Sequence, residues 1–122
     1  MAEENNQDLD LSLLNEIADG SDEFIVDSIS MFLEQTPVAL TEIANNIAEG
    51  KWSEAAGAAH KIKATLGFFG MLNSQALMQQ IEAECKAGGT PGTSSIFTEA
   101  KAIIEGNIPA LQQIQAEASA RL

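Results

Sequence analysis

The stretch AAHKIKATLGFFG, residues 58–70, carries the only histidine of the chain and has the spacing of an amphipathic helix. At about 100° per residue, its apolar side chains and the alanines just before them gather on one arc. This core stripe consists of Ala55, Ala58, Ala59, Ile62, Leu66 and Phe69. His60 projects well away from the centre of the stripe. We therefore expect an exposed imidazole on a helix that Ser53 caps, that reaches about Phe69 and that ends at Gly70.

The neighbours of His60 one helical turn away are mostly small. They are Ala56, Gly57, Lys63, Ala64 and Gly67. A glycine inside a helix costs about 1 kcal/mol relative to alanine, so two glycines beside an exposed imidazole indicate a bare patch where another protein could approach the ring. Lys63 shares this face, and its cation would suit an anion held on the ring.

Other interpretations of this face stay open. A single histidine in a helical protein is usually a surface or packing residue, and Gly57 and Gly67 could serve close helix packing. A metal site is poorly supported, because Cys85 lies 25 positions from His60 and no H-E-x-x-H or C-x-x-C pattern occurs. A hydrolytic triad is also poorly supported, because no serine or cysteine near His60 in sequence could serve as its nucleophile.

The chain before this stretch is helical in pattern, and no segment of the sequence alternates cleanly between apolar and polar residues as a strand would. Residues 9–20, LDLSLLNEIADG, predict a short helix closed by Gly20. Ser21 is the predicted cap of the next helix, whose apolar face continues to Gly50. Within it, Pro37 predicts either a kink or the start of a new helix.

The chain after this stretch predicts two further helices. The first begins at Asn73 or Ser74, and residues 88–95, GGTPGTSS, form a flexible loop by composition. A final helix follows, and Gly106 and Pro109 weaken its middle and could kink it.

We expect one all-α domain over residues 9–122, preceded by a flexible tail over residues 1–8. Short connections between helices favour antiparallel neighbours. The expected architecture is therefore an elongated antiparallel four-helix bundle with an extra short N-terminal helix packed across one end. A chain of 122 residues is long enough to bury one such core.

The composition restricts the possible partners and location. Eighteen acidic against six basic residues give a net charge of −12, which repels phosphate backbones and anionic lipid, so we expect no nucleic-acid and no membrane binding. No apolar run approaches the roughly 18 residues that cross a bilayer. The start, MAEENNQD, does not resemble a secretion signal, and the single Cys85 cannot form an internal disulfide. We expect a cytoplasmic monomer.

The stretch AHKIKATLGFFG resembles the signature of histidine-containing phosphotransfer domains. That signature is a histidine, any residue, a hydrophobic residue, lysine and glycine, with a second glycine ten positions after the histidine. The matching residues are His60, Ile62, Lys63 and Gly70. Ala64 departs from it, because the family most often has glycine there, and the added methyl group could narrow the choice of partner. The resemblance extends from about Phe24 to Lys86.

The resemblance implies a phosphoryl carrier rather than an enzyme. His60 would accept a phosphoryl group on Nε2 from an aspartyl-phosphate and pass it to a second aspartate, while Lys63 would offset charge on that group. Glu82, 22 residues after His60, would accept a hydrogen bond from the Nδ1–H of the ring. Gln79 is a weaker candidate for the same task, and Glu82 could instead be a solvated carboxylate. The chain has no Gly-rich phosphate loop, so we expect no cofactor of its own.

The partners that the resemblance implies are receiver domains of response regulators and a sensor or hybrid histidine kinase. We expect them to dock on the bare patch around His60, at Gly57, Ala64 and Gly67. Exposed apolar side chains would form the rim of this surface, as is usual in a transient interface. The candidates are Phe68, Met71, Leu13 and Leu14.

Two other classes of function stay open. A helical adaptor could dock receivers or kinases without carrying phosphate, if Ala64 and an unpaired Glu82 impair the chemistry. An enzyme could use His60 and Glu82 as an acid–base pair on a small metabolite. That enzyme would require a concave pocket of roughly several hundred Å³, which a slim bundle with an exposed histidine rarely offers.

Overall fold

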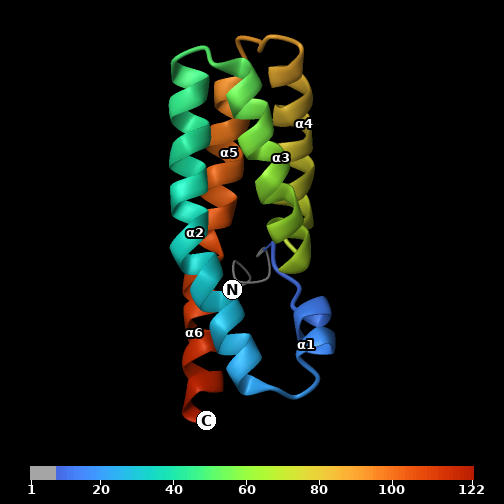
Figure 1. Cartoon of the computed structure of the whole chain (residues 1–122), viewed down its shortest axis with the longest axis vertical. Coiled ribbons are helices and arrows are strands. Elements are labelled where there is room, and N and C mark those ends of the chain that lie inside the picture. Colours follow the sequence, from blue (N-terminus) through green and yellow to red (C-terminus); the bar gives the residue numbers. More distant parts are fainter. Residues whose placement is uncertain (1–7) are drawn as a thin grey trace, which may run out of the picture.

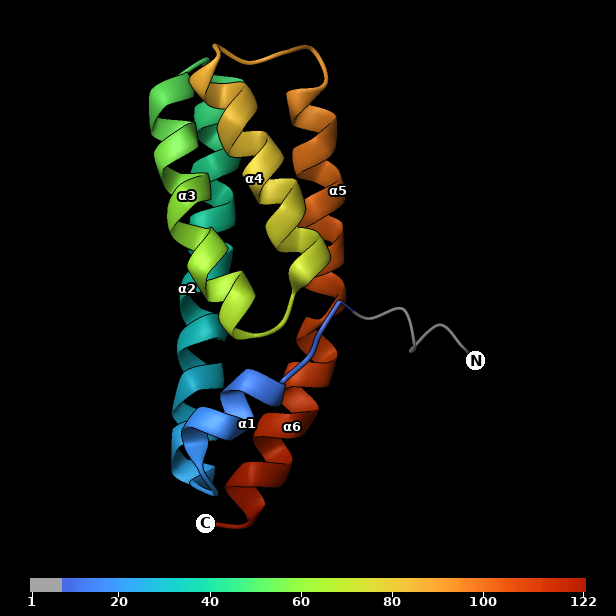
Figure 2. The same ribbon diagram turned by 90° about the vertical axis from the view of Figure 1, so that its right-hand side faces the viewer.

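The computed structural model describes residues 8–122, and this part of the chain forms six α-helices and no strand (Figures 1 and 2). They are α1 (Ser12–Ala18), α2 (Asp22–Ala48), α3 (Trp52–Phe68), α4 (Leu72–Lys86), α5 (Thr93–Gly106) and α6 (Ile108–Ala120). Helices α2 to α5 run antiparallel in an elongated bundle, and α6 continues α5 along the lower half of α2 (Figure 1). Helix α1 packs against α2 below the turn between α3 and α4 (Figure 2). The all-α bundle predicted from sequence is confirmed.

Helix α2 begins as predicted at Ser21, whose Oγ accepts a hydrogen bond from the backbone N–H of Phe24 at 3.1 Å. The helix then passes through Pro37 without interruption. The prediction that a new helix starts at Pro37 is therefore wrong. Because α2 stays continuous, it spans both halves of the bundle and contacts α3, α5 and α6 (Figure 1).

Helix α3 buries the predicted stripe. Every member of it is at least nine-tenths buried: Ala55, Ala58, Ala59, Ile62, Leu66 and Phe69. The predicted N-cap is wrong, because the helix begins at Trp52 and Ser53 lies inside its first turn. Its end agrees with the prediction. Gly70 has φ +67°, and a Cβ there would collide with the backbone carbonyl of Asp10, so glycine is required on both counts.

Helix α4 begins at Leu72, slightly earlier than predicted, and a buried carboxylate caps it. Asp8 Oδ1 accepts from the backbone N–H of Asn73 at 2.9 Å, and Oδ2 accepts from the backbone N–H and the hydroxyl of Ser74 at 2.7 Å each. The backbone of Asp8 also exchanges two hydrogen bonds with the buried side chain of Asn107. The predicted tail was therefore one residue too long, since Asp8 is buried; its other residues, 1–7, lie outside the described part of the chain.

The predicted final helix is divided in two. Helix α5 ends at Gly106 and α6 begins at Ile108, with Asn107 between them. Pro109 stands in the first turn of α6, where its missing N–H costs nothing, whereas in a continuous helix that N–H would be needed. The prediction of a weakened middle located this point correctly, but the result is a break rather than a kink. Helix α5 also begins at Thr93, inside the segment predicted as loop.

Candidate functional site

His60 lies on the outer face of α3, and its side chain is 68% exposed. Its Nδ1 is 3.0 Å from Oε2 of Glu82, which is on the adjacent helix α4. The turn at Gly70 makes α3 and α4 antiparallel neighbours, so two residues 22 positions apart meet. The ring is thus held at one nitrogen, while most of it remains open to solvent.

Glu82 is almost fully buried, and Lys63 reaches it from α3. Lys63 Nζ lies 2.6 Å from Oε1 of Glu82 and also donates a hydrogen bond to Oε1 of Gln79 at 2.6 Å. Within the described residues, no donor meets Glu82 Oε1 along a hydrogen-bonding direction, so this contact is an ion pair. Gln79, the weaker candidate for holding the ring, holds Lys63 instead.

A second lysine, which sequence reasoning missed, contacts the other oxygen of the same carboxylate. Lys86 Nζ lies 3.0 Å from Oε2 of Glu82, the oxygen that also faces His60 Nδ1. The two residues are four apart on α4, the spacing that places side chains on one helix face. That spacing was the signal in the sequence that could have identified Lys86.

The two lysines keep Glu82 ionised. The close contact with Lys63 is the largest cause of a pKa lowered from 4.5 to about 2. Burial opposes the shift by raising the pKa, and the contact with Lys86 lowers it further. Near neutral pH, Glu82 is therefore a carboxylate that only accepts hydrogen bonds.

A hollow of about 550 Å³ lies beside the ring between α3 and α4. Its lining comprises Trp52, Ser53, Ala56, Gly57, His60, Glu82, Cys85, Lys86 and Gly88. A Cβ added to Gly57 would meet nothing within 4 Å, so this flank of the histidine helix is bare. The surface around Gly57 has the open character that the sequence indicated.

Gly67, the other small residue on this face, serves packing. A Cβ there would lie 2.5 Å from Nε2 of Gln75 on α4, and that Nε2 donates a hydrogen bond to the backbone carbonyl of Lys63 at 3.0 Å. The interpretation left open for this glycine, close helix contact, is the one that fits. Gly67 leaves room for the side chain of Gln75, which reaches from α4 to the backbone of α3.

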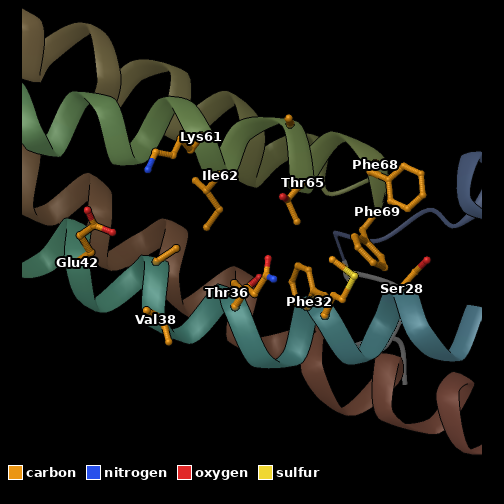
Figure 3. Close-up of a pocket in the computed structure, with 14 residues that line it drawn as sticks. Ser28, Phe32, Thr36, Val38, Glu42, Lys61, Ile62, Thr65, Phe68 and Phe69 are labelled. Atoms are coloured by element: carbon orange, nitrogen blue, oxygen red, sulfur yellow. The ribbon is translucent and has the colours of Figure 1, made fainter.

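A second depression, a groove of about 570 Å³, runs between α2 and α3 (Figure 3). Ala64, one turn from His60, belongs to its wall, as do Phe68 and the exposed Met31 and Val38 of α2. In Figure 3 the groove is lined mainly by carbon atoms, with the ring of Phe68 at one end. Apolar surface therefore adjoins the histidine.

Two of the expected rim residues are not on the surface. Met71 and Leu14 are fully buried, because Met71 turns into the core at the junction of α3 and α4 and Leu14 lies on the inner side of α1. Their prediction as exposed docking residues is wrong. Leu13 is 44% exposed, and Phe68 is partly buried in the groove wall.

Residues 8–122 hold neither a metal-ligand cluster nor a membrane-spanning helix. No group of three His, Cys, Asp or Glu side chains could hold a metal ion there. Burial, and to a lesser degree Glu84, raises the pKa of the Cys85 thiol. No described helix combines the length and the apolar character that crossing a membrane requires.

The fold and the site define a helical-bundle domain with one exposed histidine that a buried carboxylate holds through Nδ1. The family model of the Hpt domain matches residues 27–119, most of the chain, and the protein belongs to this family of histidine-containing phosphotransfer domains. Such domains transfer phosphoryl groups within phosphorelays, and they are carriers rather than catalytic enzymes. No curated protein and no solved structure matched the chain.

Proposed function

We propose that this protein carries a phosphoryl group on Nε2 of His60, between aspartates of receiver domains. The observation that supports this assignment is the 3.0 Å contact between His60 Nδ1 and Glu82 Oε2, on a ring that is 68% exposed. It leaves Nε2 as the nitrogen that is not engaged by the carboxylate. His60 is also the only histidine of the chain.

The charge state of Glu82 explains why Nε2 is the reactive atom. An ionised carboxylate accepts a hydrogen bond from Nδ1–H, so the hydrogen-bond pattern assigns the proton of the neutral ring to Nδ1. The lone pair then resides on Nε2. As Nε2 attacks phosphorus, positive charge develops on the ring, and the adjacent carboxylate stabilises it.

Each transfer step balances without a proton from solvent. The Nε2 lone pair forms the nitrogen–phosphorus bond as the bond from phosphorus to the aspartyl oxygen breaks, and the electron pair leaves with the aspartate carboxylate. The Nδ1 proton stays in its hydrogen bond to Glu82. In the reverse step an aspartate oxygen attacks phosphorus, and the electron pair returns to Nε2. The receiver would supply the Mg²⁺ and the acidic pocket.

The groove between α2 and α3 supports docking of receivers and of a sensor or hybrid kinase next to the ring. Ala64, one turn after His60 on α3, lies in the wall of the groove, and Met31 supplies apolar contact area. Phe68 and Val38 supply more of it (Figure 3). An apolar centre of this kind is typical of protein interfaces. The methyl group of Ala64 lies on this path, where it would favour receivers that leave room for it.

The site offers less support for the alternatives. The adaptor hypothesis relied partly on an unpaired Glu82, and this carboxylate contacts the ring and two lysines. The hollow beside His60 has the volume that the enzyme hypothesis needed. However, a Glu82 pKa of about 2 leaves this carboxylate without a proton near neutral pH, so in such a pair Glu82 can serve only as the base or as an orienting group.

The experiment is phosphotransfer to the full chain from a phosphorylated receiver or from a sensor kinase supplied with ATP. We expect acid-labile, alkali-stable label on the protein and none on His60→Gln, which should fold normally because the ring is exposed. Equal labelling of the substituted protein would refute the assignment. Tight receiver binding without any label would instead favour the adaptor. The monomeric state and the cytoplasmic location remain predictions.

A further inference from the structure

The two lysines at the site differ in how they are held. The side chain of Lys63 is only 19% exposed, and its Nζ is fixed between Gln79 and the buried oxygen Oε1 of Glu82. The side chain of Lys86 is 68% exposed, and its one ion pair among the described residues is with Oε2 of Glu82. The ammonium group of Lys63 is therefore held in place, whereas that of Lys86 can reorient.

They also differ in what they face. Lys86 lines the same hollow as His60, together with the open flank at Gly57, whereas neither Lys63 nor Gln79 belongs to that lining. In addition, Lys86 Nζ and His60 Nδ1 both lie 3.0 Å from one oxygen, Glu82 Oε2. The exposed lysine thus lines the same open hollow as the ring.

We propose that Lys86 is the side chain that contacts the phosphoryl group on His60, and that Lys63 is a positioning residue that acts through Glu82. This inference rests on the proposed role of His60 as the phosphorylated residue. It reverses the role of Lys63 that the sequence resemblance implied.

The cost of moving each lysine supports this division. Lys63 could turn to a phosphoryl group only by leaving both Gln79 and Oε1, and a buried carboxylate oxygen would lose its ion pair. Lys86 leaves only Oε2, which keeps its hydrogen bond from Nδ1–H. A lysine on a flexible stem forms strong hydrogen bonds to a phosphate dianion. Once Lys86 has moved, Nδ1–H is the one remaining contact of Oε2, which favours the charged, phosphorylated ring.

The test needs no partner protein. Potassium phosphoramidate phosphorylates exposed imidazoles directly, and the phosphorus-31 resonance of the full chain then reports the pH midpoint at which the phosphorylated histidine gains or loses its proton. His60→Gln identifies the resonance by its absence. We expect Lys86→Met to raise the midpoint by about 0.5 pH unit, because protonation of the phosphohistidine becomes easier when a nearby cation is removed. One pH unit corresponds to about 1.36 kcal/mol, and a partly solvated ion pair contributes a fraction of that. Lys86→Arg should restore the original midpoint.

Lys63→Met should leave that midpoint unchanged. In the unphosphorylated protein it should instead shift the nitrogen-15 resonances of His60 toward the tautomer protonated on Nε2, because Glu82 is no longer held in place. Lys61 is adjacent to His60 in sequence, but it lines the groove and not the hollow. Lys61→Met is therefore the control, and it should change neither measurement.

The proposal is overturned if Lys63→Met raises the midpoint while Lys86→Met does not, or if neither variant changes it. Failure of phosphoramidate to label His60 would also overturn it, since the ring would not be accessible. Labelling with phosphoramidate needs no receiver. If receivers failed to transfer phosphate, the proposed function would be contradicted, but the Lys86 and Lys63 variants could still be compared.

Discussion

Asp8 and Ser74 are 66 positions apart, yet Asp8 Oδ2 accepts hydrogen bonds from both the backbone N–H and the hydroxyl of Ser74 at 2.7 Å. The pair ties the segment before α1 to the first turn of α4, the helix that carries Glu82. The backbone of Asp8 also forms two hydrogen bonds with the side chain of Asn107, the residue between α5 and α6. Three parts of the bundle thus meet at one buried polar cluster.

Replacing Asp8 with alanine should lower the free energy of unfolding by about 1–3 kcal/mol, because buried donors at the start of α4 lose their acceptor. Urea unfolding followed by circular dichroism measures this. Asp10→Ala is the matched control, since Asp10 also accepts from the backbone and hydroxyl of a serine, Ser12, but in an exposed position. If both variants lose the same free energy of unfolding, the buried Asp8 cap does not stabilise the fold more than the exposed Asp10 cap.

Replacing Glu82 with glutamine should slow phosphotransfer from a phosphorylated receiver by about tenfold. The amide can still accept from Nδ1–H, but a charge-assisted hydrogen bond is roughly twice as strong, and about 1.4 kcal/mol corresponds to a factor of ten. The rate of label transfer at saturating receiver is the measurement. Glu84→Gln is the control, because Glu84 binds Thr90, Thr93 and Gln80 rather than the ring. Equal rates for wild type and Glu82→Gln would contradict the role of the carboxylate.

Acid should destabilise the folded protein through Glu82. Its pKa is about 2 in the folded state against an ordinary value of 4.5, so the unfolded chain binds the proton first as the pH falls. The contribution of Glu82 is complete above pH 4.5 and is lost between that pH and about 2. The lowered pKa values of Asp10 and Glu84 act in the same direction. Urea midpoints measured from pH 6 to 2 should fall, and the fall should be shallower for Glu82→Gln. If the urea midpoint of Glu82→Gln fell with pH as steeply as that of the wild type, Glu82 would not contribute to the acid sensitivity.

Two glycines on the histidine helix should respond oppositely to alanine. Gly57→Ala should stabilise the protein by up to about 1 kcal/mol, since the new methyl group meets open space and helix propensity improves. Gly67→Ala forces Gln75 to move and breaks its hydrogen bond to the carbonyl of Lys63, which should cancel or exceed that gain. Thermal unfolding of the two variants tests this. A similar gain in both would mean that Gln75 adapts without loss.

Much of the fold follows from local pattern. The stripe on α3, the cap at Ser21 and the turn at Gly70 each depend on residues close together in sequence. The contact between His60 and Glu82 was expected only through the family resemblance, because spacing alone does not tell how α3 and α4 align. The structure supplies that alignment.

The features that sequence reasoning missed depend on distant partners. The capping role of Asp8 requires Ser74 and Asn107, so a polar residue near the chain start looked like part of a tail. Met71 looked like an exposed rim residue because its burial depends on how the turn docks on the core. Lys86 had the correct spacing from Glu82, but its place beside the ring depends on the packing of two helices.

Trp52 lines the hollow next to His60, and it is the only tryptophan of a chain that has no tyrosine. Its indole emission therefore originates a few side chains from the ring, with no background from a second tryptophan or from a phenol. The protein contains its own fluorophore at the place where chemistry is proposed. Changes on the imidazole or the arrival of a partner can be followed optically in real time, without attaching any dye.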